Sequence, residues 1–62
     1  MMSDFNVGDR VYDLKLHRLN GDYLRGTVRR LSSRRMGAYV EWDRDPYMID
    51  FMYDDELAEW ID

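Results

Sequence analysis

The sequence predicts an all-β fold, a small barrel of four or five antiparallel strands with a short C-terminal helical turn. Apolar and polar residues alternate with a period of two over residues 38–43, which is typical of a half-buried strand. Over residues 47–53 the same period separates Tyr47, Ile49, Phe51 and Tyr53 from Met48, Asp50 and Met52. Turn-forming residues separate the apolar runs, and Asn20-Gly21 is the strongest of these signals. The 62 residues allow one domain only, which we expect to cover residues 1–62.

The first half of the chain contains two predicted strands. Residues 1–6 form a short lead-in, and a strand of alternating residues follows over residues 11–17. Asn20-Gly21 then reverses the chain, because both residues tolerate a positive φ. The second strand covers residues 23–31, and Gly26 in its interior marks the sharp bend that a small barrel needs at a corner.

The second half contains two more strands and an acidic end. A polar hairpin loop over residues 32–37 leads into the third strand, over residues 38–43. Pro46 lacks a backbone donor and separates that strand from a fourth one, over residues 47–53. Residues 54–61 begin with acids and then place apolar residues at helical spacing, which predicts one or two helical turns. A short final strand is the alternative for this segment.

The alternation also predicts which side chains face the interior. On each strand we take the apolar set of alternate residues as the inner one. We expect the terminal helical turn to cover one end of the core through its apolar side chains. The expected core consists of Val11, Leu14, Leu16, Leu24, Val28, Val40, Trp42, Ile49, Phe51, Leu57 and Trp60.

The composition excludes several classes of function. The chain has no cysteine, so disulfides and thiolate metal sites are excluded, and His17 is the single histidine. A chain this short has little room for a ligand-sized pocket, so we expect no enzyme activity, no catalytic residue, no cofactor and no metal. No run of about 18 apolar residues is present to span a membrane. The N-terminus lacks the basic and apolar parts of a signal peptide, so we expect a cytoplasmic protein.

Short motifs resemble those of small SH3-like barrels of the KOW and Tudor type. They are Val7-Gly8-Asp9-Arg10-Val11, Gly26-Thr27-Val28 and Tyr39-Val40-Glu41-Trp42-Asp43, followed by Asp55-Glu56-Leu57, which is similar to the closing segment of many bacterial and phage versions. The resemblance covers residues 7–57 and implies the barrel fold. The chain departs from a KOW motif because it lacks the basic, glycine-rich first loop that contacts nucleic acid in that family. The resemblance therefore implies a fold and not a ribosomal or transcriptional role.

A basic hairpin is the most specific surface feature of the sequence. Four arginines surround the predicted turn, namely Arg29, Arg30, Arg34 and Arg35. Guanidinium groups bind carboxylates and phosphates, often through two parallel hydrogen bonds. Tyr39, together with Tyr23, lies on a flanking strand and offers a ring on which an unpaired base can stack. Three interpretations stay open: the arginines pair with acids of the same chain, bind a protein or bind nucleic acid.

The charges are divided along the chain. Residues 1–36 carry eight basic and four acidic groups, whereas residues 37–62 carry one basic and nine acidic groups, for a net charge of −4. This division indicates a polar interaction surface. We expect an acidic face in the second half, formed by Asp50, Asp54, Asp55, Glu56 and Glu59.

These observations favour a non-enzymatic protein-interaction module that uses its charged faces, the basic hairpin over residues 29–35 and the acidic segment over residues 43–62. The resemblance adds the expectation of a small phage or bacterial regulator. One alternative is a nucleic-acid-binding module that uses the same hairpin. A second is an acidic mimic of nucleic acid. We expect a protein partner, and self-association into a homo-oligomer is a further hypothesis because the charges are complementary and the core is small.

Overall fold

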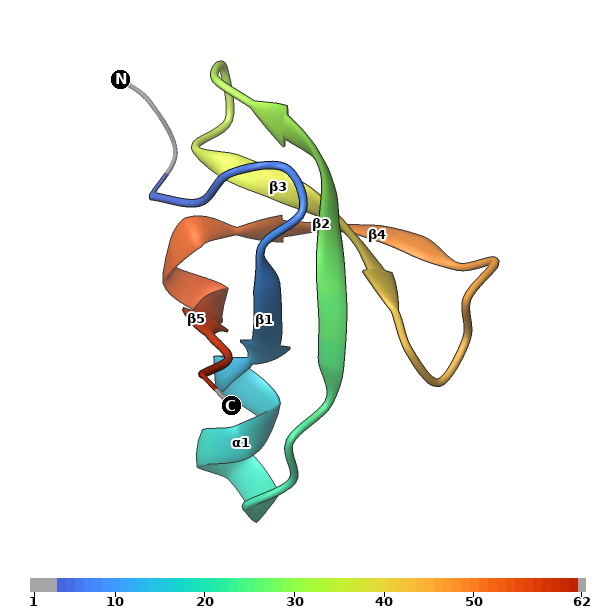
Figure 1. The fold of residues 1–62 in the computed structure, drawn as a ribbon. Helices are drawn as coiled ribbons and strands as arrows, with labels where there is room; N and C mark the ends of the chain where they lie inside the picture. Colours follow the sequence, from blue (N-terminus) through green and yellow to red (C-terminus); the bar gives the residue numbers. More distant parts are fainter. Residues whose placement is uncertain (1–3, 62) are drawn as a thin grey trace.

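A single antiparallel sheet organises the chain in the computed structural model, which describes residues 4–61 (Figure 1). The elements in chain order are β1 (Arg10–Asp13), α1 (Leu14–Asn20), β2 (Arg25–Ser32), β3 (Gly37–Trp42), β4 (Ile49–Tyr53), the 3-10 helix η1 (Asp54–Glu56) and β5 (Leu57–Glu59). The five strands lie in the order β4-β3-β2-β1-β5, and every neighbouring pair is antiparallel. The predicted all-β class is confirmed.

The sheet is open but strongly curled. β4 and β5 lie at opposite edges of the strand order, yet only the three residues of η1 connect them. Four strand spacings in a flat sheet would separate the edges by about 19 Å, whereas three 3-10 residues rise about 6 Å. The sheet must therefore bend until its edges approach each other, and in Figure 1 the chain turns from β4 through η1 to β5 beside β1. Among the described residues no strand pairing joins β4 to β5.

The strand predicted over residues 11–17 is wrong in its second half, because β1 ends at Asp13 and α1 follows. The Asp13 carboxylate accepts a hydrogen bond of 3.0 Å from the backbone N–H of Leu16, which caps the first turn of the helix. Gly21 ends the helix in the left-handed region at φ 82° and donates its N–H to the carbonyl of His17. Asn20-Gly21 is therefore a helix end and not a hairpin turn.

The core lies on the concave side of the sheet. Seven buried side chains form it: Phe5, Val11, Val28, Ala38, Val40, Trp42 and Leu57. Val11, Val28, Val40, Trp42 and Leu57 confirm the prediction. Leu24 packs against this core and is half-buried, whereas Leu14, Leu16 and Trp60 are half-buried outside it. Of the predicted lead-in, residues 1–3 lie outside the described range.

The inner face of β4 is the opposite of the predicted one. Ile49 is 54% exposed, and Phe51 is half-buried outside the core, whereas Met52 packs against the core. Asp50 lies on the same side as Met52, and its carboxylate accepts a hydrogen bond of 2.9 Å from Nε1 of Trp42. This bond satisfies the one donor of the buried indole, so the polar residue belongs on the inner face.

The C-terminal segment is shorter in helix than predicted over residues 54–61. Only η1 is helical, and β5 then pairs with β1, which corresponds to the alternative of a final strand. The carboxylate of Glu56 accepts a hydrogen bond of 3.0 Å from the backbone N–H of Tyr53 and so stabilises the turn. No helix within residues 4–61 combines the length and the apolar character needed to cross a membrane.

A candidate arginine–aromatic interface

A β-bulge in β2 places two consecutive arginines on one face of the sheet. Val28 pairs with Val40 and Arg30 pairs with Tyr39, so one residue of β2 is left over between the two pairs. Strict alternation would put Arg30 on the same side as the fully buried Val28. The bulge instead turns both Arg29 and Arg30 outward, where both are exposed.

Two guanidinium groups lie over aromatic rings on this outer face. The Cζ atom of Arg30 is 4.7 Å from the ring centroid of Tyr39. The Cζ atom of Arg35 is 4.0 Å from the centroid of Phe51 and 5.9 Å from that of Tyr53. Both arrangements fall within the range of cation–π attraction. We call Arg30, Arg35, Tyr39, Phe51 and Tyr53 the arginine–aromatic face.

The three rings of this face contact one another in a row. The centroids of Tyr39 and Phe51 are 5.4 Å apart, and those of Phe51 and Tyr53 are 5.0 Å apart, in edge-to-face geometry. Gly37 makes room for the middle ring, because a Cβ atom there would lie 2.4 Å from Cζ of Phe51. The position therefore requires glycine for the ring to lie close to β3.

The charges of the basic hairpin are mostly unneutralised. Nε of Arg29 donates a hydrogen bond of 2.7 Å to the carboxylate of Glu41, on the neighbouring strand. Arg34 is exposed on the turn and forms no ion pair or ring contact with the rest of residues 4–61. A side-chain hydrogen bond with Tyr53 raises the pKa of Arg35 above its ordinary value. Three positive charges, those of Arg30, Arg34 and Arg35, therefore remain at the surface.

The structure brings together four of the five arginine and tyrosine residues predicted to bind. Arg29, Arg30, Arg35 and Tyr39 share the outer face, while Arg34 lies on the turn at its end. Sequence reasoning missed Phe51 and Tyr53 as members of this face. Their alternation along β4 was visible, but alternation alone does not indicate which side of a strand is buried.

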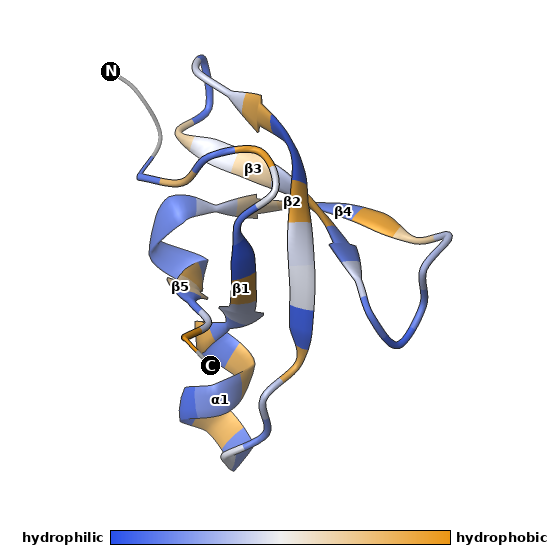
Figure 2. Cartoon of the chain, viewed as in Figure 1, coloured by the Kyte–Doolittle hydropathy of each residue, from blue (hydrophilic) through white to orange (hydrophobic). Residues whose placement is uncertain are grey.

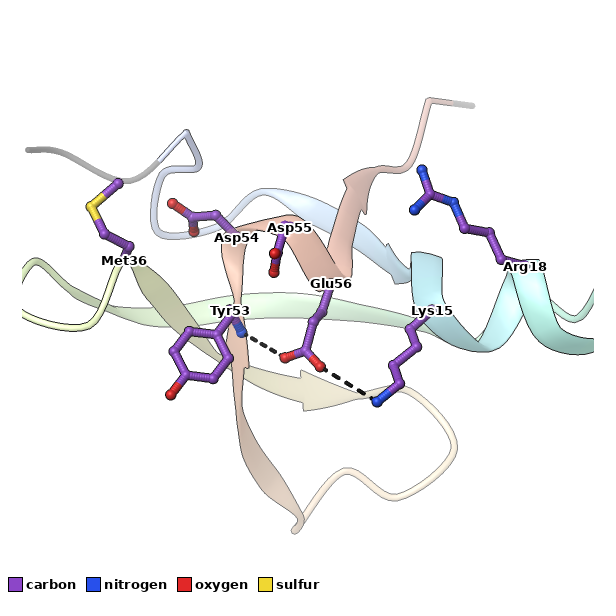
Figure 3. A pocket seen from close by; sticks show the side chains of 7 residues that line it. All are labelled: Lys15, Arg18, Met36, Tyr53, Asp54, Asp55 and Glu56. Carbon is purple, nitrogen blue, oxygen red and sulfur yellow. Dashed lines mark hydrogen bonds and ion pairs between the residues drawn. The ribbon is translucent and has the colours of Figure 1, made fainter.

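The predicted acidic face is not continuous. Asp50 is held on the inner side of β4 by Trp42, and Glu59 lies on β5. Three of the acids remain together on η1, and they line an open groove of about 680 Å³ (Figure 3). The lining residues are Lys15, Arg18, Met36, Tyr53, Asp54, Asp55 and Glu56. Because α1 contributes two basic side chains, the groove has mixed charge.

Glu56 connects the two sides of this groove. One carboxylate oxygen accepts the N–H of Tyr53, and the other lies 4.0 Å from Nζ of Lys15 (Figure 3). The side chain of Lys15 is largely exposed, so solvent weakens this ion pair. The groove is open to solvent and lies between α1 and η1, so it is not an enclosed binding site.

A second group of rings, which sequence reasoning missed, lies where β1, β5 and α1 meet. We call Tyr12, His17, Tyr23 and Trp60 the aromatic cluster. His17 stacks on Tyr23 with centroids 4.1 Å apart, and Tyr12 and Tyr23 each contact Trp60 edge to face, at 6.0 and 5.2 Å. Cζ of Arg25 lies 5.0 Å from the ring of Trp60. The four residues are scattered along the chain, so no local pattern indicates their association.

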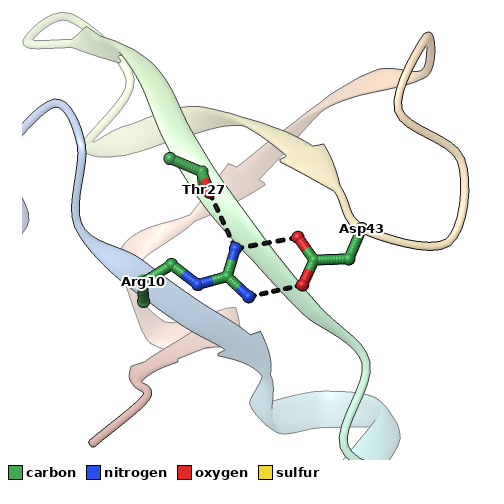
Figure 4. Close-up of polar contacts among 3 residues, drawn as sticks. All are labelled: Arg10, Thr27 and Asp43. Carbon is green, nitrogen blue, oxygen red and sulfur yellow. Dashed lines mark hydrogen bonds and ion pairs between the residues drawn. The ribbon is translucent and has the colours of Figure 1, made fainter.

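A three-residue polar contact connects β1 and β2 to the loop after β3 (Figure 4). Arg10 donates to both carboxylate oxygens of Asp43 and also, at 2.8 Å, to the hydroxyl of Thr27. The hydrogen bond from Arg10 lowers the pKa of Asp43 below its ordinary value. Side chains from distant parts of the sequence are thus held together on the convex side of the sheet.

The described residues contain no group of three or more histidine, aspartate or glutamate side chains placed to hold a metal ion. Searches against protein-family models, curated proteins and solved structures found no match to this chain. The function of the chain is therefore inferred from the geometry of its surface.

Proposed function

We propose that this protein is a non-enzymatic protein-interaction module whose arginine–aromatic face binds an acidic segment of a partner protein. The observation that carries the proposal is the placement of two guanidinium groups over rings, Arg30 over Tyr39 and Arg35 over Phe51. A guanidinium that stacks through its flat side keeps its N–H groups in the plane, at the edge. Those N–H groups are then available to a carboxylate in bidentate geometry.

The stacking also favours binding by limiting the entropy that binding costs. Ordering a long side chain at an interface costs about 0.5–1.5 kcal/mol. Arg30 and Arg35 already have a supporting ring in the absence of a partner, so less of this cost remains. Tyrosine and arginine are also the residue types that most often dominate protein–protein interfaces.

A protein partner fits the surroundings of this face better than nucleic acid does. Nucleic acid presents a long row of phosphates, which the acidic residues of a chain with a net charge of −4 repel along its length, whereas a short acidic segment needs to meet only the arginines. Exposed apolar side chains lie at the start of β4, where Ile49 is 54% exposed, and in the loop before it, where Tyr47 and Met48 are 98% and 57% exposed. Apolar residues beside arginine and tyrosine are typical of protein interfaces.

We also propose that the curled sheet is a small SH3-like barrel. Two observations support this finer assignment. The three-residue connection between the edge strands requires a strong bend, and the barrel-like motifs of the sequence fall on β1, β2, β3 and the η1–β5 junction. Under this assignment the arginine–aromatic face is the convex surface formed by β2, β3 and β4.

The proposed function is tested by binding of short labelled peptides in which glutamates adjoin leucine or phenylalanine. Matched peptides carry glutamine in place of glutamate, and a short single-stranded oligonucleotide serves as the competing ligand. We expect fluorescence anisotropy to show binding of the glutamate peptides, and the double variant Arg30→Ala/Arg35→Ala to weaken it at least about tenfold. The control Arg18→Ala/Arg44→Ala removes the same charge outside the face and should leave affinity unchanged.

Three results would contradict this proposal. Equal binding of glutamate and glutamine peptides would mean that carboxylates are not recognised. Equal losses in the two double variants would mean that net charge, and not the face, is responsible. Tighter binding of the oligonucleotide, with a steep dependence on salt, would replace the proposal with a nucleic-acid-binding function.

A further inference from the structure

No strand within residues 4–61 pairs with the outer edge of β4. β4 is the first strand in the order β4-β3-β2-β1-β5, so one of its sides faces solvent. The N–H of Asp54 donates to the carbonyl of Met36 across the β3–β4 pair. The backbone N–H and C=O groups point to alternate sides along a strand. Met52 and Asp50 therefore also direct their N–H and C=O groups toward β3. Ile49, Phe51 and Tyr53 direct their N–H and C=O groups to the free edge.

Part of this edge is already satisfied within the chain. The N–H of Tyr53 donates to the carboxylate of Glu56, which agrees with its direction away from β3. Both backbone groups of Ile49 and Phe51 and the carbonyl of Tyr53 remain for an additional strand. These groups are the ones that a neighbouring antiparallel strand would bind.

Of the features that usually protect an edge strand, β4 has only an inward-pointing charge, that of Asp50, and this carboxylate is bonded to Trp42. Such strands are commonly very short or carry lysine, proline or a bulge. β4 has five residues, Ile-Asp-Phe-Met-Tyr, with Asp50 as the one charged side chain, and Figure 2 shows hydrophobic colour at its start. The opposite edge, β5, has only three residues, so the two edges are not equivalent.

We infer that two copies of this chain pair through their β4 edges, antiparallel to each other, about a two-fold axis at Phe51. In this register Phe51 lies opposite the Phe51 of the second copy, Ile49 lies opposite Tyr53, and Asp50 lies opposite Met52. Apolar side chains thus meet apolar side chains along the outer face. The two five-stranded sheets become one continuous sheet.

The other registers that use the same backbone groups are less favourable. A two-fold axis at Asp50 would place two carboxylates directly opposite each other, which is destabilising. An axis at Met52 would pair Phe51 with Tyr53, whose N–H is already bonded to Glu56. The axis at Phe51 avoids the facing carboxylates. Its central pair, Phe51 with Phe51, does not use the Tyr53 N–H, which is needed only in the two outer pairs of Ile49 with Tyr53.

The edge of β4 is suited to pair with the same edge of a second copy of the chain. The side chains of Ile49, Phe51 and Tyr53 are apolar on both sides of Phe51, so the row matches itself when one copy is turned by a two-fold axis. A two-fold contact uses the same surface on both copies, so one pairing covers both exposed edges and leaves no β4 edge for further growth. The inference does not rest on the proposed function, since the pairing uses backbone groups of β4 and not the arginines.

The first experiment measures association by sedimentation equilibrium over a wide range of protein concentration. We expect a monomer–dimer equilibrium, and the variant Ile49→Lys should weaken it at least about tenfold because it places a charge on the edge. The control Leu19→Lys adds the same charge on α1, at a side chain that is 81% exposed, and should leave the equilibrium unchanged. A wild-type protein that stays monomeric throughout, or equal effects of the two variants, would overturn the inference.

The second experiment tests the register. The chain has no cysteine, so a single introduced thiol can form a disulfide only between two copies. Facing Cα atoms of a hydrogen-bonded pair lie about 5.5 Å apart, which is within the range of a disulfide. Phe51→Cys should therefore oxidise to a cross-linked dimer at least about tenfold faster than Leu19→Cys. Equal rates would contradict a two-fold axis at Phe51.

Amide exchange provides a readout in the unmodified protein. The N–H groups of Ile49 and Phe51 should exchange more slowly with deuterium as protein concentration rises, because pairing protects them. The N–H of Leu16, which is bonded to Asp13 at the start of α1 and lies away from β4, serves as the internal reference. Exchange at Ile49 and Phe51 that does not depend on concentration would overturn the inference, even if the variants were to unfold.

Discussion

The arginine–aromatic face and the aromatic cluster are built from the same kinds of side chain but have different surroundings. In the aromatic cluster, rings from α1, β1, the segment before β2 and the segment after β5 contact one another, with centroids 4.1–6.0 Å apart. In the arginine–aromatic face, the rings stand on β3 and β4 only, and guanidinium groups cover them. The cluster therefore joins separate elements, whereas the face presents charge on one surface of the sheet.

This difference separates a structural role from a binding role. Each ring of the aromatic cluster is supported by another element, so its removal should weaken the fold. The rings of the face are supported from below by the sheet and contact arginine above, so changes there should alter the surface more than the stability. Three substitutions test this distinction, and a fourth, at Asp43, provides an ion pair outside both regions for comparison. They follow in order of expected effect.

Trp60→Ala should have the largest effect on stability. Trp60 contacts Tyr12, Tyr23 and Arg25, and it is half-buried, so we expect a loss of about 2–3 kcal/mol in the free energy of unfolding. Urea denaturation measures the loss. Binding of the glutamate peptides by the folded fraction should not change. A stability loss below that of Tyr39→Ala, the matched ring of the face, would contradict the structural role of the cluster.

Gly37→Ala should disturb the face without breaking the core. The added Cβ atom would meet the ring of Phe51 at 2.4 Å and the carbonyl of Met52 at 2.5 Å, so the ring must move. We expect a stability loss of about 1–2 kcal/mol from overpacking. Because Arg35 rests on that ring, peptide affinity should fall as well. If Gly37→Ala lowers the stability but leaves the affinity for the peptides unchanged, the ring of Phe51 does not support binding by Arg35.

His17→Phe should stabilise the protein. Nδ1 of His17 is buried and has no hydrogen-bond partner among residues 4–61, while the ring stacks on Tyr23. Replacing a buried, unsatisfied polar group by an apolar ring of similar shape removes a desolvation cost, so we expect a gain of about 0.5–1 kcal/mol. Thermal unfolding at neutral pH measures it. His17→Ala, which removes the stacked ring, is the destabilising control.

Asp43→Asn should have the smallest effect, and the effect should depend on pH. Arg10 lowers the pKa of Asp43 below its ordinary 3.8, so the stabilisation is present above that value and is lost as the pH falls through the lowered pKa. The pair is exposed, so we expect a difference of only about 0.5 kcal/mol between wild type and variant at pH 7. Unfolding measured at pH 7 and at pH 2 should show that difference shrinking. An equal difference at both pH values would contradict this account.

The sequence predicted the centre of the sheet correctly, because alternation is clear where both faces are defined. On β3, Ala38, Val40 and Trp42 alternate with Tyr39 and Glu41, and the structure has these two sets on opposite faces. On β4 the same period of two is present, but both sets contain large apolar residues. The hydrogen bond between Asp50 and Trp42 decides which set is inward, and that bond joins residues of two different strands.

Local competition between structures explains the other differences. Residues 14–17 fit a strand by alternation, yet Asp13 caps a helix there and Gly21 ends it. The basic hairpin could be predicted because its arginines are adjacent in sequence. Its geometry could not, because the bulge that turns Arg29 and Arg30 to the same face is a property of the β2–β3 register and leaves no mark on the residue pattern.

The short connection through η1 also has a consequence for how the chain folds. The pairs β2–β3 and β3–β4 join neighbouring segments, so closing them costs little entropy and we expect them to form early. β5 pairs with β1, where Val11 faces Glu59, so the two ends of the chain must meet before these hydrogen bonds form. Pairings between distant segments are slow. The bend of the sheet therefore depends on the pairing between its most distant segments, and we expect this step to come last in folding.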